Sequence, residues 1–381
     1  MAPQIDLLRR RPEFFVFLGT LVLSFIAIAV FEAGRVPGND GSQYLLMAED
    51  PGAQVAAPYV TRVLGPLVVW ALPTGPSAGF WILTAASFAT AATLLFSLLE
   101  DMTGSKRRAL GGVAVFLAAA STPNLRNPYL LDAFSYCLLL GVILMAVRQR
   151  WWSLVLLMPL ALLTRDPLIV LAAPAVLILA IGRREAWLPL AVTAAVTVGV
   201  WLLLNKTSLV LGFVPTHKED YFSAEQIHHV LRYERRYGSL SKVAVSSVIF
   251  SFGAVWLAPL ISRSAIWRNK AARATAASGV VAILLAPFIT DWIRALGYAF
   301  PLIITAVALL PRGDQLHGTL ALAMCVAAMN FGIQPMLTGG AKYLLEATAL
   351  LLEIIILFTL SRRPNTDLAA FNLPARRLRS G

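Results

Sequence analysis

Long apolar runs separated by short polar links make up most of the chain, from Phe14 to Leu360. Such runs approach the roughly 20 residues that a helix needs to cross a bilayer. The pattern predicts an all-α, polytopic integral membrane protein with about 12 transmembrane helices, in a range of roughly 10 to 13. The expected crossings are 14–31, 80–98, 110–120, 130–147, the two short runs on either side of 164–167, 187–204, 243–261, 275–289, 295–310, 320–332 and 343–360.

Two polar segments are longer than the other links, and we expect both to be outer loops. The first, 32–75, should hold juxtamembrane helices, because its apolar part, 59–72, is interrupted by Arg62 and Pro66 and is too short to cross. The second is 205–242. We expect residues 1–363 to form a single transmembrane domain and residues 364–381 to form a basic, disordered cytoplasmic tail.

Composition and charge agree with a membrane protein. Hydrophobic residues form 58% of the chain and charged residues 14%, whereas soluble domains carry about 25% charged residues. The net charge is +12, and Lys and Arg gather in the links expected on one side, as in cytoplasmic links of membrane proteins. We therefore expect a multi-pass protein of the cell membrane with both termini in the cytoplasm. No motif for a nucleic-acid partner is present.

Two cysteines, Cys137 and Cys325, stand far apart in apolar runs. Their spacing predicts neither a disulfide framework nor a metal site, so we expect both to pack in the core.

Ionisable residues outside the basic links gather near the expected outer ends of the crossings. At membrane depth such groups cost several kcal/mol unless they are paired or hydrated, so they mark functional sites. Their common level predicts a chemical or binding site at the outer face, open to the periplasm or exterior. The residues are Asp40, Arg62, Arg126, Asp132, Arg165, Asp166, Asp291 and Arg294.

Asp40 follows a Gly-Asn turn and begins a short amphipathic helix that carries Tyr44. One interpretation makes Asp40 the N-cap of this helix. Another makes it a general base that accepts a proton from an attacking hydroxyl. The two interpretations are compatible.

The arginines at the outer level also have two interpretations. Each could anchor the protein at lipid headgroups, or together they could bind an anion, because guanidinium groups donate two hydrogen bonds to phosphate. Asp291 stands three residues before Arg294, and Asp166 follows Arg165 directly. These neighbours could simply pair with each other.

The second outer loop contains a stretch in which His228, Arg232 and Arg235 would share one face of a helix. Adjacent histidines without a matching carboxylate are a poor metal signal, and we expect no metal site. A solvated amphipathic helix over the site is the favoured interpretation. In the last crossing Lys342 and Glu346 are spaced to pair, whereas Glu353 is deep and has no explanation in the sequence.

The arrangement resembles the GT-C superfamily of membrane glycosyltransferases, in bacterial forms that use polyprenyl-phosphate sugars. In these enzymes a large first outer loop, directly behind the first crossing, carries the catalytic Asp. Asp40 stands at the corresponding place in this chain. The segments NPYLLDAFSYCLLLGVILMAVRQR, LALLTRDPLIVLAAPAVLILAIGRR and TDWIRALGYAFPLIITAVALLP are similar to later motifs of these enzymes. The chain has the single acid of Asn39-Asp40 where many members have two, which leaves metal use open.

The resemblance implies an inverting transfer of a sugar to an acceptor hydroxyl of a glycan, lipid or protein, with Asp40 as the base. The lipid phosphate is then expected at Arg62, Arg165, Arg294 and Arg126. Substrate contacts are expected at Tyr44, Asn127, Asp132, Asp166, Asp291 and His228. Three alternatives stay open: a multi-pass transporter or lipid flippase, an outer-leaflet transferase of phospholipid or acyl groups, and a non-catalytic subunit of an envelope assembly.

Overall fold

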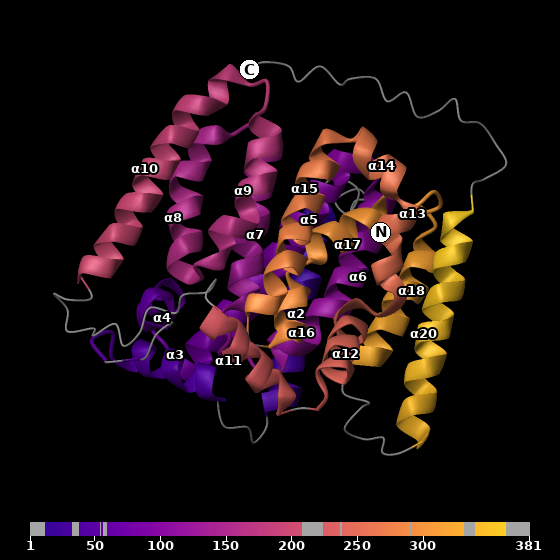
Figure 1. Ribbon diagram of the computed structural model, residues 1–381, viewed down its shortest axis with the longest axis horizontal. Helices are drawn as coiled ribbons and strands as arrows, with labels where there is room; N and C mark the ends of the chain where they lie inside the picture. The colour runs from indigo at the N-terminus through magenta and orange to yellow at the C-terminus, as the bar shows by residue number, and fades with distance from the viewer. Residues whose placement is uncertain are drawn as a thin grey trace, which may run out of the picture.

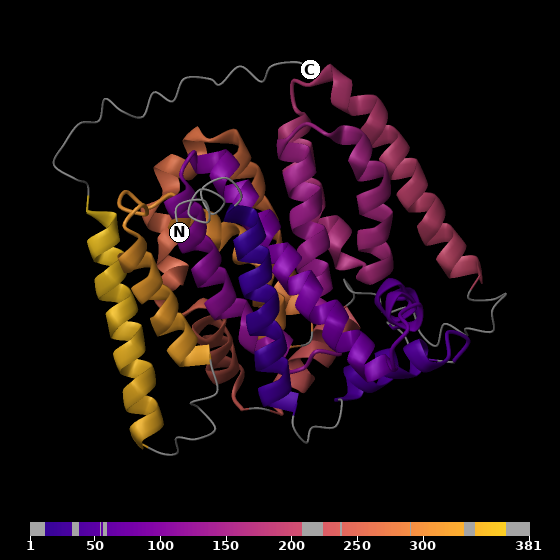
Figure 2. The same ribbon diagram turned by 180° about the vertical axis from the view of Figure 1, so that it is seen from behind.

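The computed structural model describes residues 12–32, 38–53, 55, 59–207, 224–236, 238–289, 291–330 and 340–362. Within these ranges the chain is all-helical, without strands. Figures 1 and 2 show the longer helices running roughly side by side, so that successive ones alternate in direction. The predicted fold class is confirmed as far as its helical character.

Helix α5 (Pro76–Thr103) is the most buried of the six helices that are long and apolar enough to cross a membrane. It packs most extensively against α2 (Pro12–Glu32), α6 (Lys106–Leu125) and α7 (Asp132–Val147), and its buried face is rich in alanine and phenylalanine, which allows close packing. Phe88 of α5 and Phe300 of α17 both contact the ring of Phe116 on α6, which joins the two halves of the chain.

Short helices occupy the first long polar segment. The 3-10 turn η1 (Tyr59–Thr61) and α4 (Leu64–Trp70) follow α3 (Asn39–Glu49). At seven residues α4 is far shorter than a crossing, as its prolines and Arg62 predicted. α3 packs on α4, and both lie at one end of the bundle in Figure 1.

A hairpin of two short apolar helices leads into a long third one. α8 (Leu154–Thr164) and α9 (Pro167–Ala180) flank Arg165 and Asp166, as the sequence predicted, and α10 (Arg184–Thr207) packs on α8. Pro167 stands at the start of α9, where a proline fits because its missing N–H has no helical partner.

The second half of the chain contains several interrupted helices. α12 (Leu240–Phe252) breaks at Gly253 into the 3-10 turn η3 (Gly253–Leu257) and α13 (Ala258–Ile261). Gly253 has φ +54°, a left-handed conformation that glycine adopts without strain. The remaining elements are α11 (Ala224–Arg235), α14 (Arg263–Arg268), α15 (Lys270–Leu285), η4 (Ala286–Phe288), α16 (Trp292–Gly297), α17 (Phe300–Ala308), α18 (Leu316–Asn330) and α20 (Gly340–Ser361).

Among the described residues, six helices are long and apolar enough to cross a membrane. Five more apolar helices are shorter, between 10 and 17 residues. The chain is therefore compatible with a membrane protein, and the count of about 12 crossings stays a prediction. Whether residues 1–363 form a single domain also stays a prediction, and the tail 364–381 lies outside the described residues.

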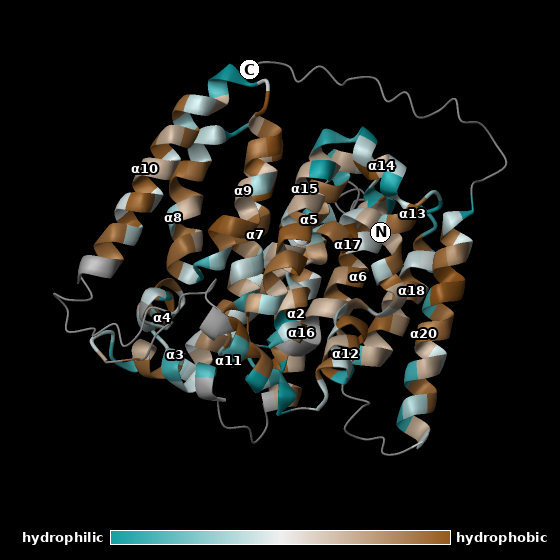
Figure 3. Ribbon diagram, in the orientation of Figure 1, coloured by the Kyte–Doolittle hydropathy of each residue, from teal (hydrophilic) through white to brown (hydrophobic). Residues whose placement is uncertain are grey.

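The two ends of the bundle carry most of its hydrophilic residues. Figure 3 shows hydrophilic residues at both ends, with apolar helical surface between them. We call the end with α3, α11 and α16 the α3 end, and the end with α14 and the start of α10 the α14 end. Helix α2 begins and α20 ends toward the α14 end in both views, which agrees with termini on one side.

Basic side chains at the α14 end close the ends of neighbouring helices. Lys270 donates to the carbonyl oxygens of Leu179 and Ile181 at 3.1 and 2.8 Å. Arg108 donates to the carbonyl oxygens of Ala308 and Leu310 at 3.0 and 2.9 Å. Cations satisfy the carbonyl groups that a helix leaves unpaired at its C-terminus. Some of the basic links thus hold neighbouring helices together.

Candidate functional site

Four segments that are distant in the sequence meet at the α3 end. Asp40 lies in the first turn of α3, Asp132 begins α7, Arg165 separates α8 from α9, and Arg294 lies in α16. The contact between Asp40 and Arg294 joins residues 254 positions apart. We call these four residues with Tyr298 the ionic cluster.

Asp132 is the centre of the ionic cluster. Its side chain is buried, and its Oδ1 accepts hydrogen bonds from Arg165 Nη1 and, at 2.7 Å, from Tyr298 Oη. Its Oδ2 accepts from Arg294 Nε at 2.9 Å and lies 2.7 Å from Arg294 Nη2. One carboxylate therefore holds two guanidinium groups that would otherwise repel each other in a site with little water.

Asp40 faces the more open side of the cluster, with its side chain 35% exposed. Its Oδ2 accepts from Arg294 Nη1 at 3.1 Å, and its Oδ1 accepts from Tyr59 Oη at 2.6 Å. The N-cap interpretation is wrong, because α3 begins at Asn39 and Gly38 precedes it without a side-chain cap. The carboxylate is thus available to the ionic cluster and not to its own helix.

The pKa of Asp40 is set by opposing effects. Partial burial alone would raise the pKa, but the hydrogen bond from Tyr59 and the charge of Arg294 outweigh it, so the pKa lies below its usual value. Asp40 is therefore ionised at neutral pH. A carboxylate in this state can accept a proton.

Tyr59 was not predicted as a site residue. Burial raises its pKa, and the hydrogen bond to ionised Asp40 raises it further, so the phenol stays protonated and acts as a donor. Its ring packs edge-on against Tyr44 at 5.3 Å. In the sequence, only its position three residues before Arg62 sets Tyr59 apart. A tyrosine in an apolar stretch does not by itself indicate a contact with a charged residue.

Arg62 and Tyr44 lie behind Asp40. Arg62 is 8% exposed and donates from Nη1 to Tyr44 Oη at 3.3 Å. Its guanidinium carbon is 6.0 Å from the centre of the Tyr59 ring. This placement keeps the positive charge of Arg62 near Asp40 while the Arg62 side chain stays buried. Arg62 therefore stabilises the ionised form of Asp40 without facing the open side of the site.

Asp166 and Arg165 do not pair with each other. Asp166 Oδ1 accepts from Thr61 Oγ1 at 3.2 Å, whereas Arg165 is bound to Asp132 and Tyr298. The interpretation of an isolated Arg-Asp pair at the hairpin tip is therefore wrong. The contact with Thr61 instead fastens this tip to the first loop.

Asp291 acts on the backbone of the helix that carries Arg294. It has φ +66°, and its Oδ1 accepts from the Arg294 N–H at 3.3 Å, which makes it the N-cap of α16. Its Oδ2 lies 3.9 Å from Arg294 Nε, at the limit of an ion pair. Burial raises the pKa of Asp291, partly offset by the charge of Arg294.

Glu234 of α11 completes this turn, and it was not predicted as a site residue. Its Oε1 accepts from the N–H groups of Asp291 and Trp292 at 2.9 and 3.2 Å. The side chain is buried, and burial raises its pKa despite these two hydrogen bonds. The amphipathic helix predicted in the second long loop is thus fixed to the segment that positions Arg294.

Three predicted site residues stand apart from the ionic cluster. Asn127 approaches Gly38, since a Cβ on that glycine would be 3.8 Å from its Nδ2, and its Oδ1 is buried without a partner among the described residues. Arg126 is half-buried in the link after α6. His228 is exposed on α11 and belongs to none of the cluster contacts given above. Their roles in substrate binding stay predictions.

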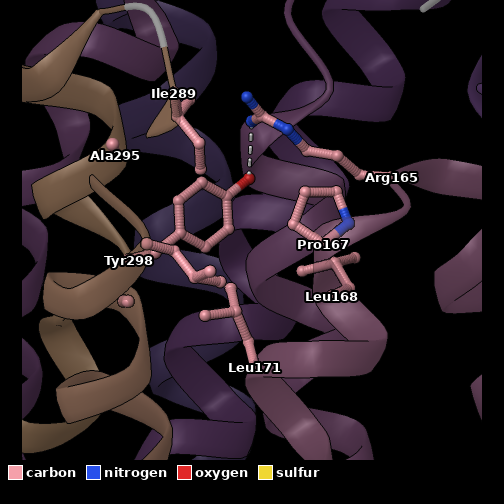
Figure 4. A pocket seen from close by; sticks show the side chains of 9 residues that line it. Arg165, Pro167, Leu168, Leu171, Ile289, Ala295 and Tyr298 are labelled. Atoms are coloured by element: carbon pink, nitrogen blue, oxygen red, sulfur yellow. Dashed lines mark hydrogen bonds between the residues drawn. The ribbon is translucent and has the colours of Figure 1, made fainter. Parts of the chain in front are cut away.

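A narrow cleft begins at Arg165 and continues between helices. In Figure 4 Arg165 and Tyr298 lie at one end of the cleft, joined by a hydrogen bond of 2.9 Å, with apolar side chains below them. The guanidinium carbon is 5.2 Å from the centre of the Tyr298 ring, within cation–π range. The other lining residues are Pro167, Leu168 and Leu171 of α9, Ala282 and Leu285 of α15, Ile289 and Ala295.

The described residues contain no group of three His, Cys, Asp or Glu side chains placed to hold a metal ion. In the ionic cluster the two aspartates already face two guanidinium groups, an environment that repels a cation. The absence of a metal cofactor stays a prediction.

No known family model, curated protein or solved structure matches the chain. The resemblance to GT-C enzymes therefore depends on the sequence segments alone. The site has to be interpreted from its own chemistry.

Proposed function

We propose that this protein is a membrane glycosyltransferase that moves a sugar from a polyprenyl-phosphate donor to an acceptor hydroxyl, with inversion, at the outer face of the cell membrane. The observation that supports it most is the juxtaposition of an ionised, half-exposed carboxylate, two guanidinium groups and an apolar cleft. These are the parts that transfer from an anionic amphiphile requires: a base, an anion site and a place for the tail.

Arg294 and Arg165 are the residues proposed to hold the donor phosphate. Arg294 is fixed along one edge by Asp132, through Nε and Nη2, and turns Nη1 toward Asp40. Both contacts that Arg165 makes in the cluster use Nη1. Each guanidinium has five N–H donors, so a phosphate can bind without breaking the contacts to Asp132.

The apolar cleft is the proposed site for the first isoprene units. Its polar end at Arg165 and its walls of Leu168 and Leu171 match the two ends of a prenyl phosphate. Burial of a hydrocarbon chain against these side chains would add affinity of about 25 cal/mol per Å² of apolar surface. The head group and the tail are thereby oriented together.

Asp40 is the proposed base. As the acceptor oxygen forms a bond to the anomeric carbon, its proton passes to Asp40, and the bond from that carbon to the phosphate oxygen breaks. The electron pair leaves with the lipid phosphate, whose charge Arg294 and Arg165 stabilise. Attack from the face opposite the leaving group inverts the configuration.

The ion pair between Asp40 and Arg294 gives this mechanism an order. Arg294 Nη1 is turned toward Asp40 and donates to its Oδ2 at 3.1 Å. A donor phosphate that takes Nη1 frees Asp40 Oδ2 for the acceptor. The donor is therefore expected to bind before the acceptor.

Incubation of purified protein with a panel of polyprenyl-phosphate sugars tests this function. The proposal expects release of polyprenyl phosphate from at least one donor, dependent on an acceptor. Arg165→Gln should raise the KM for that donor, whereas Arg183→Gln, at the α14 end and 45% exposed, should leave it unchanged. No release from any donor, with the folded state verified, contradicts the proposal.

A second candidate, a transporter or flippase, is favoured by one observation. The helix formed by α12, η3 and α13 is interrupted, and the buried Glu353 packs against the interruption. Broken helices with ionisable groups are typical of coupling-ion sites in transporters. Proton- or sodium-driven movement of a lipid in proteoliposomes, unaffected by Asp40→Asn, would support this candidate over the first.

A further inference from the structure

Glu353 is a carboxylic acid inside the helical bundle, remote from the ionic cluster in sequence and contacts. It belongs to α20, one of the helices long and apolar enough to cross a membrane, and its side chain is 0% exposed. Ionisable groups at such a depth are costly and are retained for a reason.

Among the described residues, the Glu353 carboxylate has a single hydrogen-bond donor. Its Oε2 accepts from the Ala254 N–H at 2.6 Å, one of the backbone groups left unpaired where α12 breaks. Its Oε1 is buried and has no hydrogen-bond partner among the described residues. A Cβ on Gly253 would collide with the carboxylate, so the break in the helix is shaped around Glu353.

Among the described residues, the elements packed around Glu353 provide no positive charge that would balance its ionised form. The turn η3 has no titratable side chain, and α18 contributes Cys325, which lies within electrostatic range. His317 of α18 lies at the far end of the contact between α18 and α20, next to Gly318, which packs against Leu360. On α20 itself Lys342 is eleven residues from Glu353 and pairs with Glu346 at 3.9 Å.

An ionised carboxylate in this setting would keep one hydrogen bond and lose its hydration. Such a group takes up a proton instead, because the neutral acid is far cheaper to bury. We infer that Glu353 is a proton-binding site in the interior of the bundle, with the proton on Oε1. Loss of this proton would draw water or a cation between η3 and α20 and weaken the contact between these two elements.

Infrared spectroscopy of the purified full-length protein tests this inference directly. The wild type should show the carbonyl-stretch band of a protonated carboxylic acid near neutral pH, and Glu353→Gln should lose it. Glu346→Gln, on the same helix and paired with Lys342, should leave the band unchanged. If the difference spectrum between wild type and Glu353→Gln contains carboxylate bands instead, the inference is wrong.

Thermal unfolding over a range of pH values gives a second, independent readout. The folded wild type holds a proton that the unfolded chain releases, so its unfolding midpoint should fall as the pH rises. Glu353→Gln mimics the neutral acid and should match the wild type at acid pH without that fall. Glu353→Ala leaves the Ala254 N–H unpaired and should unfold at a lower temperature throughout. A Glu353→Gln midpoint as low as that of Glu353→Ala would overturn the inference.

Discussion

At the scale of single residues, the site is organised by Asp132. A buried carboxylate between two guanidinium groups is stable only as a complete set, since each charge compensates the desolvation of the others. The side chain of Asp132 is only 6% exposed, so it does not reach the open side of the cluster. Asp132 therefore positions Arg165 and Arg294. This geometry favours a positioning role over the direct substrate contact that the sequence predicted.

Asp132→Asn should destabilise the protein strongly. Removal of one partner from a buried ion pair typically costs about 3–5 kcal/mol, because the opposite charges stay buried. Reversible unfolding in detergent measures this loss. The matched control is Asp101→Asn, since Asp101 pairs with Arg148 at 2.8 Å on the surface, with both side chains more than a third exposed. An exposed pair contributes about 0–1 kcal/mol, so equal effects of the two variants would contradict the role of Asp132.

Tyr59→Phe should change the pH dependence of activity. The Tyr59 hydroxyl stabilises ionised Asp40, so its loss raises the pKa of that carboxyl toward its ordinary range. Because the base must be ionised, activity is lost as the pH falls through its pKa, and this acid limb of kcat/KM should move to higher pH in the variant. Tyr44→Phe, whose hydroxyl contacts Arg62 instead, should leave the limb in place. An unchanged limb in Tyr59→Phe would show that Asp40 is not the titrating base.

The sequence located most of the ionic cluster but not its pairings. Asp40, Asp132, Arg165 and Arg294 were assigned to one level because each stands at the end of an apolar run. Which carboxylate meets which guanidinium depends on how helices pack sideways, and hydropathy does not encode this. Tyr298 was missed because tyrosine is common at the ends of crossings, although it follows Arg294 by four residues on the same face.

At the scale of elements, the placement of Arg294 depends on the contact between α11 and the start of α16. Asp291 adopts a left-handed conformation that a non-glycine residue rarely adopts. Glu234 binds the two N–H groups of this turn, and Asp291 caps the helix. A helix from the second long loop thereby controls the geometry of a residue in the ionic cluster.

Glu234→Ala should weaken donor binding, although it changes no residue of the ionic cluster. Two partly buried N–H groups would lose their acceptor, at a cost of about 1–3 kcal/mol, and the start of α16 should shift. We expect a higher KM for the donor with a smaller change in kcat. Arg235→Ala, at an exposed neighbouring position on α11, serves as the control. Donor affinity equal to that of the wild type in Glu234→Ala would exclude this coupling.

At the scale of the whole molecule, the ionic cluster and the basic helix ends occupy opposite ends of the bundle. The positive-inside rule then predicts that the α3 end faces the periplasm or exterior. The apolar runs were sufficient to predict helices in their correct order. The interruptions at Gly253 and between α16 and α17 were not foreseen, because side-chain and packing contacts determine them.

Cysteine labelling in intact cells tests this orientation. Glu49 and Glu185 are both exposed, at the end of α3 and the start of α10 respectively. An impermeant thiol reagent should label Glu49→Cys from outside and label Glu185→Cys only after the cells are opened. The reverse pattern would place the ionic cluster in the cytoplasm and remove the basis for an outer-face transferase.

The most direct test of the account is the turnover of the best polyprenyl-phosphate sugar donor by Asp40→Asn. If Asp40 is the base, the variant should fold and bind the donor, but kcat should fall by about 10²- to 10⁴-fold. Asp50→Asn is the matched control, since Asp50 lies at the other end of the same helix and its side chain accepts a hydrogen bond from the Gly52 N–H, away from the ionic cluster. Asp40→Asn turnover within a fewfold of the wild type would contradict the central claim.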